Sequence, residues 1–401
     1  MIILVLNCGS SSIKYQVIEK SEKAQSLLAK GGVERIGLSE GILVHKPTGK
    51  DKVEIVKAIP DHTIGINMIL SAIVDKEYGV IKSFDNINAV GHRVAHGGEY
   101  FTQSVIVDSD TKSKIENCFE LAPLHNPANF KGILAIEALM PKVPQVAVFD
   151  TSFHQTIPAE NFLYAIPYRY YTEMKIRKYG FHGTSHKFVA QKACDMLGLD
   201  INNSKLITCH IGNGASVTAV LNGKSIDTSM GFTPVDGLVM GTRCGAIDPG
   251  VLLYIADKKN MSTKEISNLI NKESGMMGLS GVSSDMRDIH SAIEEGNTRT
   301  KTALKVFNNR IVHYVGAYAA LMNGVDAIVF TGGIGENDEF VREGVCKQLE
   351  FLGLKFNYEL NHKLRGKDMI LSKEGSKLKA VIATTDEELV IATDTYNLLK
   401  K

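Results

Sequence analysis

Apolar and polar residues alternate in short stretches near the N-terminus, which is the pattern of a half-buried strand. An apolar run over residues 2–6 is followed by a small-residue turn, and the alternation resumes over residues 13–18. This pattern predicts a hairpin, followed by further short strands past residues 53–56. Apolar residues then take helical spacing over residues 66–73, so we expect an amphipathic helix there.

Strands and helices are predicted along the rest of the chain. Asn126 followed by Pro127 predicts a capped helix that reaches about residue 139, and Thr184-Ser185 predicts another that reaches about residue 197. After a buried strand that ends at Asp150, we expect a second unit to start. The other expected strands cover residues 88–94, 143–149, 206–209, 216–221, 326–330 and 379–383. Two further helices are expected over residues 302–321 and 338–349, and a terminal helix is expected after the acidic cap at residues 385–388.

A strand, a small-residue turn and a second strand occur twice, over residues 4–17 and 207–220. Gly9 and Gly212 stand at corresponding places in the two copies. A duplication would place two phosphate-cradling loops across one cleft. Coincidence is the alternative, because strand, glycine and strand is a common order, and the sequence leaves both open.

Composition excludes several classes of protein but selects no activity. The 401 residues contain 45 Lys and Arg against 44 Asp and Glu, so the chain lacks the positive field used for non-specific binding to nucleic acid or anionic membranes. Apolar residues make up 44% and charged residues 22%, as in a folded globular protein. The six cysteines are scattered and form no C-x-x-C pair, and the sequence shows no signal sequence and no apolar run of membrane length. We therefore expect a cytoplasmic protein.

Three groups of glycines are candidates for binding chemistry. The turn over residues 7–14 offers serine hydroxyls and Lys14, although a purely structural serine-rich turn explains it as well. Glycines beside basic residues recur over residues 91–98, 179–186 and 230–245, where arginine suits carboxylate or phosphate recognition and a solvated turn is the alternative. The strand and glycine turn over residues 328–337 suit a nucleotide, without the G-x-G-x-x-G order of dinucleotide sites.

A zinc site is a weaker interpretation of the second group. His182 and His186 have the spacing of metal ligands on a helix, but Gly183 stands where a zinc protease would carry glutamate.

Together these segments resemble the acetate kinase family, in the superfamily of sugar kinases, actin and heat-shock chaperones. The resemblance covers residues 2 to about 395. It rests on residues 4–14, 91–94, 149–154, 179–186, 230–243 and 331–337. It implies an α/β fold of two ribonuclease-H-like domains, residues 1–150 with 386–401 and residues 151–385, with mixed sheets flanked by helices and an active site in the interdomain cleft. It also implies a homodimer formed through the second domain.

The implied reaction is reversible, Mg²⁺-dependent transfer of the ATP γ-phosphoryl group to acetate, giving acetyl phosphate and ADP. Mn²⁺ could replace Mg²⁺. By resemblance, Arg93 and Arg243 hold the acetate carboxylate and the phosphoryl group, His182 bonds that group, and His125 supports it. Asn7 and Glu387 serve the metal. The substrate methyl pocket consists of Ala95, Leu124, Phe181 and Pro234. The ATP-binding residues are Ser10, Ser12, Lys14, His210, Ile211, Gly212, Asn213, Gly214, Asp285, Met286, Arg287, Gly333, Ile334, Gly335, Glu336 and Asn337.

Asp150 corresponds to the family's catalytic carboxylate. Because acetate is already ionised at neutral pH, there is no proton for a general base to remove, and we expect Asp150 to orient Arg93 or a metal-bound water. Three positions depart from the family pattern: Cys244 for a frequent Ser, Ala246 for a frequent Asp and Ala95 for a frequent Val. The loss of two methyl groups at residue 95 predicts easier acceptance of propionate.

Two rival functions remain. A propionate or butyrate kinase would keep the chemistry and change only the pocket. An ATP-driven binding or chaperone module would close around nucleotide without forming an acyl phosphate, and it would leave Arg93, Arg243 and His182 without a purpose.

Overall fold

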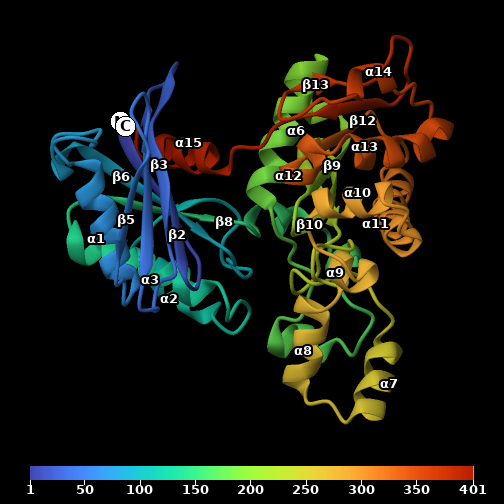
Figure 1. Cartoon of the computed structure of the whole chain (residues 1–401), viewed down its shortest axis with the longest axis horizontal. Coiled ribbons are helices and arrows are strands. Elements are labelled where there is room, and N and C mark those ends of the chain that lie inside the picture. The colour runs from blue at the N-terminus through green and yellow to red at the C-terminus, as the bar shows by residue number, and fades with distance from the viewer. Residues whose placement is uncertain (401) are drawn as a thin grey trace. The chain divides into compact units, whose positions relative to one another are not determined.

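The computed structural model describes residues 1–400, which form two compact units (Figure 1). The first unit consists of Met1–Ser152 and the C-terminal segment from Asp386 onward, and the second consists of Phe153–Thr385. Each unit is built on one mixed β-sheet flanked by helices. The expected α/β class with two mixed sheets is therefore confirmed.

The sheet of the first unit has eight strands in the order β5-β4-β3-β2-β1-β6-β8-β7. The expected hairpin is confirmed, because β1 and β2 pair antiparallel with Leu4 opposite Val17. β6 and β8 run parallel to β1 and place their carboxyl ends at one edge of the sheet. The strands are β1 Ile2–Cys8, β2 Ser12–Lys20, β3 Gln25–Glu34, β4 Gly41–Pro47, β5 Val53–Lys57, β6 Ile87–Val94, β7 Val105–Ile106 and β8 Gln145–Phe149.

Helices cover both faces of this sheet. Helices α1 (His62–Ile73) and α3 (Asn126–Leu139) bury their apolar residues on one face, and the C-terminal helix α15 (Glu387–Leu399) packs on the other. Gly91 in β6 lets α15 come close, because a Cβ there would lie 2.6 Å from Ile391 Cγ2. Helix α2 (Ser109–Asn117) and a 3₁₀ turn at Phe84–Asn86 complete the unit.

Asn126 does not cap α3, contrary to expectation. His125 is the N-cap residue and makes no side-chain cap, and Asn126 is already inside the helix. The Asn126 amide instead accepts from the His96 N–H at 3.0 Å and donates to the His96 carbonyl at 2.8 Å. It therefore ties the start of α3 to the segment that follows β6.

The sheet of the second unit has six strands in the order β11-β10-β9-β12-β14-β13. β9, β12 and β14 are parallel, and β10 pairs antiparallel with β9. The strands are β9 Lys205–Ile211, β10 Ala215–Leu221, β11 Lys224–Thr228, β12 Ala327–Thr331, β13 Met369–Ile370 and β14 Lys379–Ile382. The strands from β3 through β2, β1 and β6 to β8 have the same order and directions as those from β11 through β10, β9 and β12 to β14, which supports the duplication.

Helices α6 (Gly183–Leu197) and α11 (Thr298–Leu321) pack on opposite faces of the second sheet. α6 starts at Gly183 with His182 as N-cap residue, so the expected cap at Thr184-Ser185 is wrong. The remaining α-helices are α4 Ala159–Phe162, α5 Arg169–Met174, α7 Pro249–Lys259, α8 Thr263–Lys272, α9 Gly275–Ser280, α10 Met286–Glu294, α12 Gly332–Asn337, α13 Glu339–Cys346 and α14 Tyr358–Asn361, and 3₁₀ turns cover Ser152–Thr156, Ile201–Asn203 and Lys347–Leu352. Among residues 1–400, no helix has the length and apolar character needed to cross a membrane.

Candidate active site

In the first unit, Arg93 and Asp150 form an ion pair where two parallel strands end. Arg93 is the last but one residue of β6, and Asp150 directly follows β8, with its N–H bonded to the Val94 carbonyl at 3.1 Å. Arg93 Nη2 lies 2.5 Å from Asp150 Oδ2, and Arg93 Nε lies 3.0 and 3.1 Å from the two carboxylate oxygens. Asp150 is only 2% exposed, so its charge raises the pKa of Arg93.

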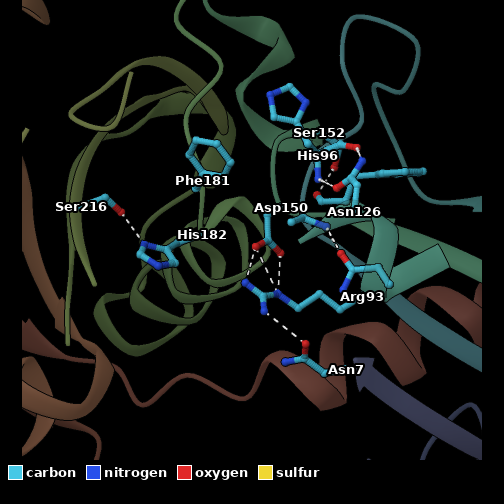
Figure 2. Close-up of polar contacts among 12 residues, drawn as sticks. Asn7, Arg93, His96, Asn126, Asp150, Ser152, Phe181, His182 and Ser216 are labelled. Carbon is cyan, nitrogen blue, oxygen red and sulfur yellow. Dashed lines mark hydrogen bonds and ion pairs between the residues drawn. The ribbon is translucent and has the colours of Figure 1, made fainter. Parts of the chain in front are cut away.

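Asn7 holds the other end of the same guanidinium (Figure 2). Arg93 Nη1 donates to Asn7 Oδ1 at 3.2 Å, from the strand next to β6. These contacts use three of the five guanidinium N–H groups and fix its plane. The remaining two N–H groups suit an anionic ligand such as a carboxylate.

Glu387 adds a second carboxylate to this region. It is the first residue of α15, capped by Asp386, whose side chain accepts from the Leu389 N–H. Burial, and then the nearby Asp150 charge, raise the pKa of Glu387, while the Arg93 charge opposes this shift. A bound cation would offset the repulsion between the two carboxylates, and the amide and carboxylate oxygens are the donors that Mg²⁺ prefers. The residues present therefore fit a magnesium ion.

The other predicted residues of the first unit lie around these groups. Lys14 is exposed and stands opposite Asn7 in the hairpin, Ser10 lies in its turn, and Ser12 is the first residue of β2. Ala95 is buried, and its N–H bonds Asn129 Oδ1 at 2.9 Å. Leu124 and His125 are both exposed just before α3.

In the second unit, His182 and Arg243 lie beside the turn between β9 and β10. A Cβ on Gly214 would lie 3.4 Å from Arg243 Nη1 and 3.6 Å from His182 Nε2. The absence of that side chain leaves open space in front of both groups. His182 has a left-handed backbone with φ of 56°, which is uncommon for residues other than glycine and typical of functional positions.

Arg243 differs from Arg93 because it has no ion pair among the described residues. Its Nη1 donates to the Pro234 carbonyl at 3.2 Å and lies 3.9 Å from Met240 Sδ. Burial is the only cause acting on the pKa of Arg243, and it lowers that pKa. A half-buried cation without a carboxylate partner is suited to an incoming anion.

A cavity of about 400 Å³ in the second unit is lined by many of the predicted nucleotide-binding residues. Its lining includes Asn213, Asp285, Met286, Arg287, Gly333, Ile334 and Asn337. The Arg287 guanidinium donates three hydrogen bonds to the Asp285 carboxylate, and this lowers the pKa of Asp285 to about 2. A volume of this size holds a ligand as large as a nucleoside.

Other predicted nucleotide residues do not line this cavity. Glu336 accepts from the N–H groups of Gly332 and Thr385, both at 3.0 Å, and so joins the segments after β12 and β14. Gly335 is buried. His210, Ile211, Gly212 and Gly214 belong to β9 and the turn after it, on the side of His182 and Arg243.

Sequence reasoning missed several residues that line this cavity. The cavity is also lined by Ser284, His290, Asp338, Glu339, Phe340 and Arg365. His290 Nε2 bonds Asp338 Oδ2 at 2.7 Å, and its ring lies 4.8 Å from that of Phe340. Asp338 follows the glycine turn directly and caps α13, so the helix-start pattern was the signal available for it.

Zinc is disfavoured at His182 and His186. His186 Nδ1 bonds Thr208 Oγ1 and His186 Nε2 bonds Ser216 Oγ, both at 2.7 Å. Both ring nitrogens are occupied, so neither has a lone pair available for a metal ion.

The chain matches the family model described as the acetokinase family over residues 2–393. It is 54% identical over 400 residues to the acetate kinase of Syntrophomonas wolfei, and covers 100% of both chains. The crystal structure of Porphyromonas gingivalis acetate kinase superposes with a TM-score of 0.96 at 50% identity, covering 100% of both chains. A propionate kinase from Francisella tularensis superposes with a TM-score of 0.90 at 42% identity, covering 99% of this chain and 100% of its own.

Proposed function

The chain belongs to the acetokinase family, and we propose that it reversibly transfers the γ-phosphoryl group of ATP to acetate, giving acetyl phosphate and ADP. The observation that carries this proposal is the arrangement of Arg243 and His182 around Gly214. A cation without an ion pair and an imidazole Nε2 border the same open space, which suits a phosphoryl group in transfer. Phosphoryl transfer depends mainly on positioning and charge neutralisation, and these side chains supply both.

We propose that the first unit recognises the carboxylic acid. The two remaining N–H groups of Arg93 would bind the acetate carboxylate. His125 would lie near the phosphoryl group and support it during transfer. Ala95 and Leu124 would line the space for the methyl group, and Phe181 and Pro234 of the second unit are proposed as further pocket residues on the strength of the family resemblance alone. Acetate carries its own negative charge at neutral pH, so Asp150 would act by holding Arg93 in place rather than by removing a proton.

We propose that Asn7 and Glu387 hold Mg²⁺, partly through water, with Mn²⁺ able to replace it. When bound, the metal would neutralise phosphate charge during transfer. The clustered oxygen donors and the raised pKa of Glu387 support this assignment.

ATP would occupy the 400 Å³ cavity with its adenosine, next to Asp285–Arg287 and Gly333–Asn337. The turn over residues 211–214 would lie along the phosphates. Ser10, Ser12 and Lys14 are proposed as further phosphate contacts on the strength of the family resemblance alone.

We further propose that the protein is a cytoplasmic homodimer formed through the second unit. All six cysteines are free and five are buried, as suits a reducing compartment. Helix α7 exposes Val251, Leu253 and Tyr254, and Leu253 is 71% exposed. Such a group of apolar side chains suits an interface between copies, and light scattering of the eluted protein would give the mass directly.

The proposed reaction is tested with purified protein, Mg-ATP and acids of two, three and four carbons. Hydroxylamine traps any acyl phosphate as a hydroxamate. We expect product with acetate and a smaller yield with propionate, which the small Ala95 side chain makes acceptable as a second substrate. Nucleotide hydrolysis or closure without trapped acyl phosphate would contradict the proposal and favour a binding module, whereas a propionate or butyrate preference would change only the named substrate.

A further inference from the structure

A continuous row of hydrogen bonds leads from the interior of the second unit to His182. Thr208 Oγ1 lies 2.7 Å from His186 Nδ1, and His186 Nε2 lies 2.7 Å from Ser216 Oγ. Ser216 Oγ then lies 2.9 Å from His182 Nδ1 (Figure 2). Thr208 and Ser216 come from the paired strands β9 and β10, and both histidines lie at the start of α6.

The inner members of this row are fully buried. Thr208, His186 and Ser216 each have 0% exposure. The His154, His182 and His210 rings lie 5.8, 6.5 and 6.2 Å from the His186 ring. Burial, and then His154 and His210, keep the pKa of His186 well below its usual value. His186 is therefore neutral and carries one proton on its two ring nitrogens.

The number of available protons favours one direction for the hydrogen bonds. Each hydroxyl supplies one donor, and a neutral His186 supplies one more. If Thr208 donates to His186, His186 donates to Ser216 and Ser216 donates to His182 Nδ1, every donor in the row is used. In the reverse direction, the Thr208 hydroxyl has no acceptor among its contacts in residues 1–400, and a buried donor without a partner is costly.

We propose that Thr208, His186 and Ser216 act as positioning residues that hold His182 as the neutral tautomer with its proton on Nε2. The Nε2–H then donates a hydrogen bond to the transferring phosphoryl group, in the space beside Gly214. This inference rests on the proposed function for the identity of the ligand, but the tautomer itself does not depend on that identity.

The charged and titratable groups of the second unit that face His182 are consistent with a neutral ring. The His210 ring from β9 stacks on it at 4.2 Å, and His210 Nδ1 bonds Ser185 Oγ at 2.8 Å. Arg243 Nη1 and His182 Nε2 both border the space that a Gly214 Cβ would fill, so a second positive charge on the ring would lie close to the guanidinium.

The test is nitrogen NMR of the full chain labelled with ¹⁵N-histidine, with His182→Gln used only to assign the His182 signals. In the wild-type protein we expect the neutral His182 ring to carry its proton on Nε2 and none on Nδ1. Ser216→Ala removes the donor to Nδ1, so we expect the tautomer protonated on Nδ1 to become visible. A wild-type His182 that is protonated on Nδ1 would overturn the proposal, as would a Ser216→Ala spectrum identical to wild type.

Ser225→Ala is the matched control. Ser225 is also fully buried on a strand of the same sheet and bonds a histidine, His154 Nδ1, at 2.8 Å. Its loss should leave the His182 signals unchanged, and if it changes them as Ser216→Ala does, the effect is one of general packing and the proposal fails. If Ser216→Ala does not fold, the nearly isosteric Ser216→Cys replaces the hydroxyl with a weak thiol donor. A His182 tautomer identical to wild type in that variant would also overturn the proposal.

Kinetics give an independent readout of positioning. In Ser216→Ala we expect kcat for acetyl phosphate formation to fall about tenfold with the KM for ATP unchanged, whereas Ser225→Ala should keep the wild-type kcat. An unchanged kcat beside the expected NMR change would overturn the catalytic part of the proposal. The NMR result needs no turnover, so a protein that forms no acyl phosphate would refute the proposed function while leaving the tautomer assignment intact.

Discussion

The two units present an arginine in two different electrostatic settings. In the first unit Arg93 is bound to a buried carboxylate at 2.5 Å, so most of its charge is balanced before a ligand arrives. In the second unit Arg243 contacts a carbonyl oxygen and a thioether, and it makes no ion pair within the described residues. A paired arginine is therefore suited to orient a monoanion such as acetate, whereas an arginine without an ion pair supplies a full charge to a phosphoryl group.

The largest effect is expected from Arg243. Arg243→Ala removes the cation that would balance the phosphoryl charge, and an arginine in this role is worth about 10³-fold or more in kcat. Arg243→Lys keeps the charge but loses the planar fork, so we expect it to recover only part of the loss. Steady-state kinetics in both directions measure these effects, and a Lys variant as active as wild type would show that charge alone is sufficient.

Asp150→Asn should cause the second largest effect. The amide keeps one oxygen acceptor, but it loses the negative charge and places an NH2 donor against the guanidinium, so Arg93 is held less firmly and we expect kcat to fall by about 10²-fold. If Asp150 only positions Arg93, the shape of the pH–rate profile stays the same. The disappearance of a titrating limb in the profile would instead assign acid–base work to Asp150.

Glu387→Gln should raise the Mg²⁺ concentration for half-maximal activity by about tenfold, because one anionic ligand is lost. The raised pKa of Glu387 adds a pH dependence. As the pH falls through that raised pKa, the carboxylate takes up a proton and metal affinity is lost, so activity should decline on the acid side. Excess Mg²⁺ competes with the proton and should move this decline to lower pH. If the pH at which activity declines does not depend on the Mg²⁺ concentration, Glu387 is not a metal ligand.

Ala95→Val should give the smallest effect. The added methyl groups reduce the space for a third carbon, and a change of this size is worth about 1–3 kcal/mol of discrimination. We expect the ratio of kcat/KM for acetate over propionate to rise about tenfold. Ala95 is 6% exposed, so thermal melts must show that the variant is folded. Equal ratios in the two proteins would remove Ala95 from the pocket.

Much of the fold could be predicted because its periodicity is local. The hairpin over β1 and β2 and the helix α11 follow from alternating and helical spacing of apolar residues. Helices α7 and α8 were not predicted, although Asp248-Pro249 and the capping box of Ser262 and Glu265 mark their starts. Leu253 and its apolar neighbours on α7 are exposed and pack against no core.

The individual candidate residues could be named from the sequence, but their surroundings could not. Arg93 and Asp150 stand 57 positions apart and meet only because β6 and β8 are parallel neighbours. The contact of Ser216 with His186 joins a strand to a helix 30 positions away. Such pairings follow from sheet order and register, which a single sequence specifies only weakly.

We propose that Arg93 recognises the carboxylic acid and Arg243 the phosphoryl group. This division is measured by calorimetric titration of acetate and of acetyl phosphate into wild type, Arg93→Ala and Arg243→Ala. Arg93→Ala should lose affinity for both ligands, whereas Arg243→Ala should lose affinity for acetyl phosphate and keep most of its affinity for acetate. An equal loss of acetate affinity in the two variants would contradict it.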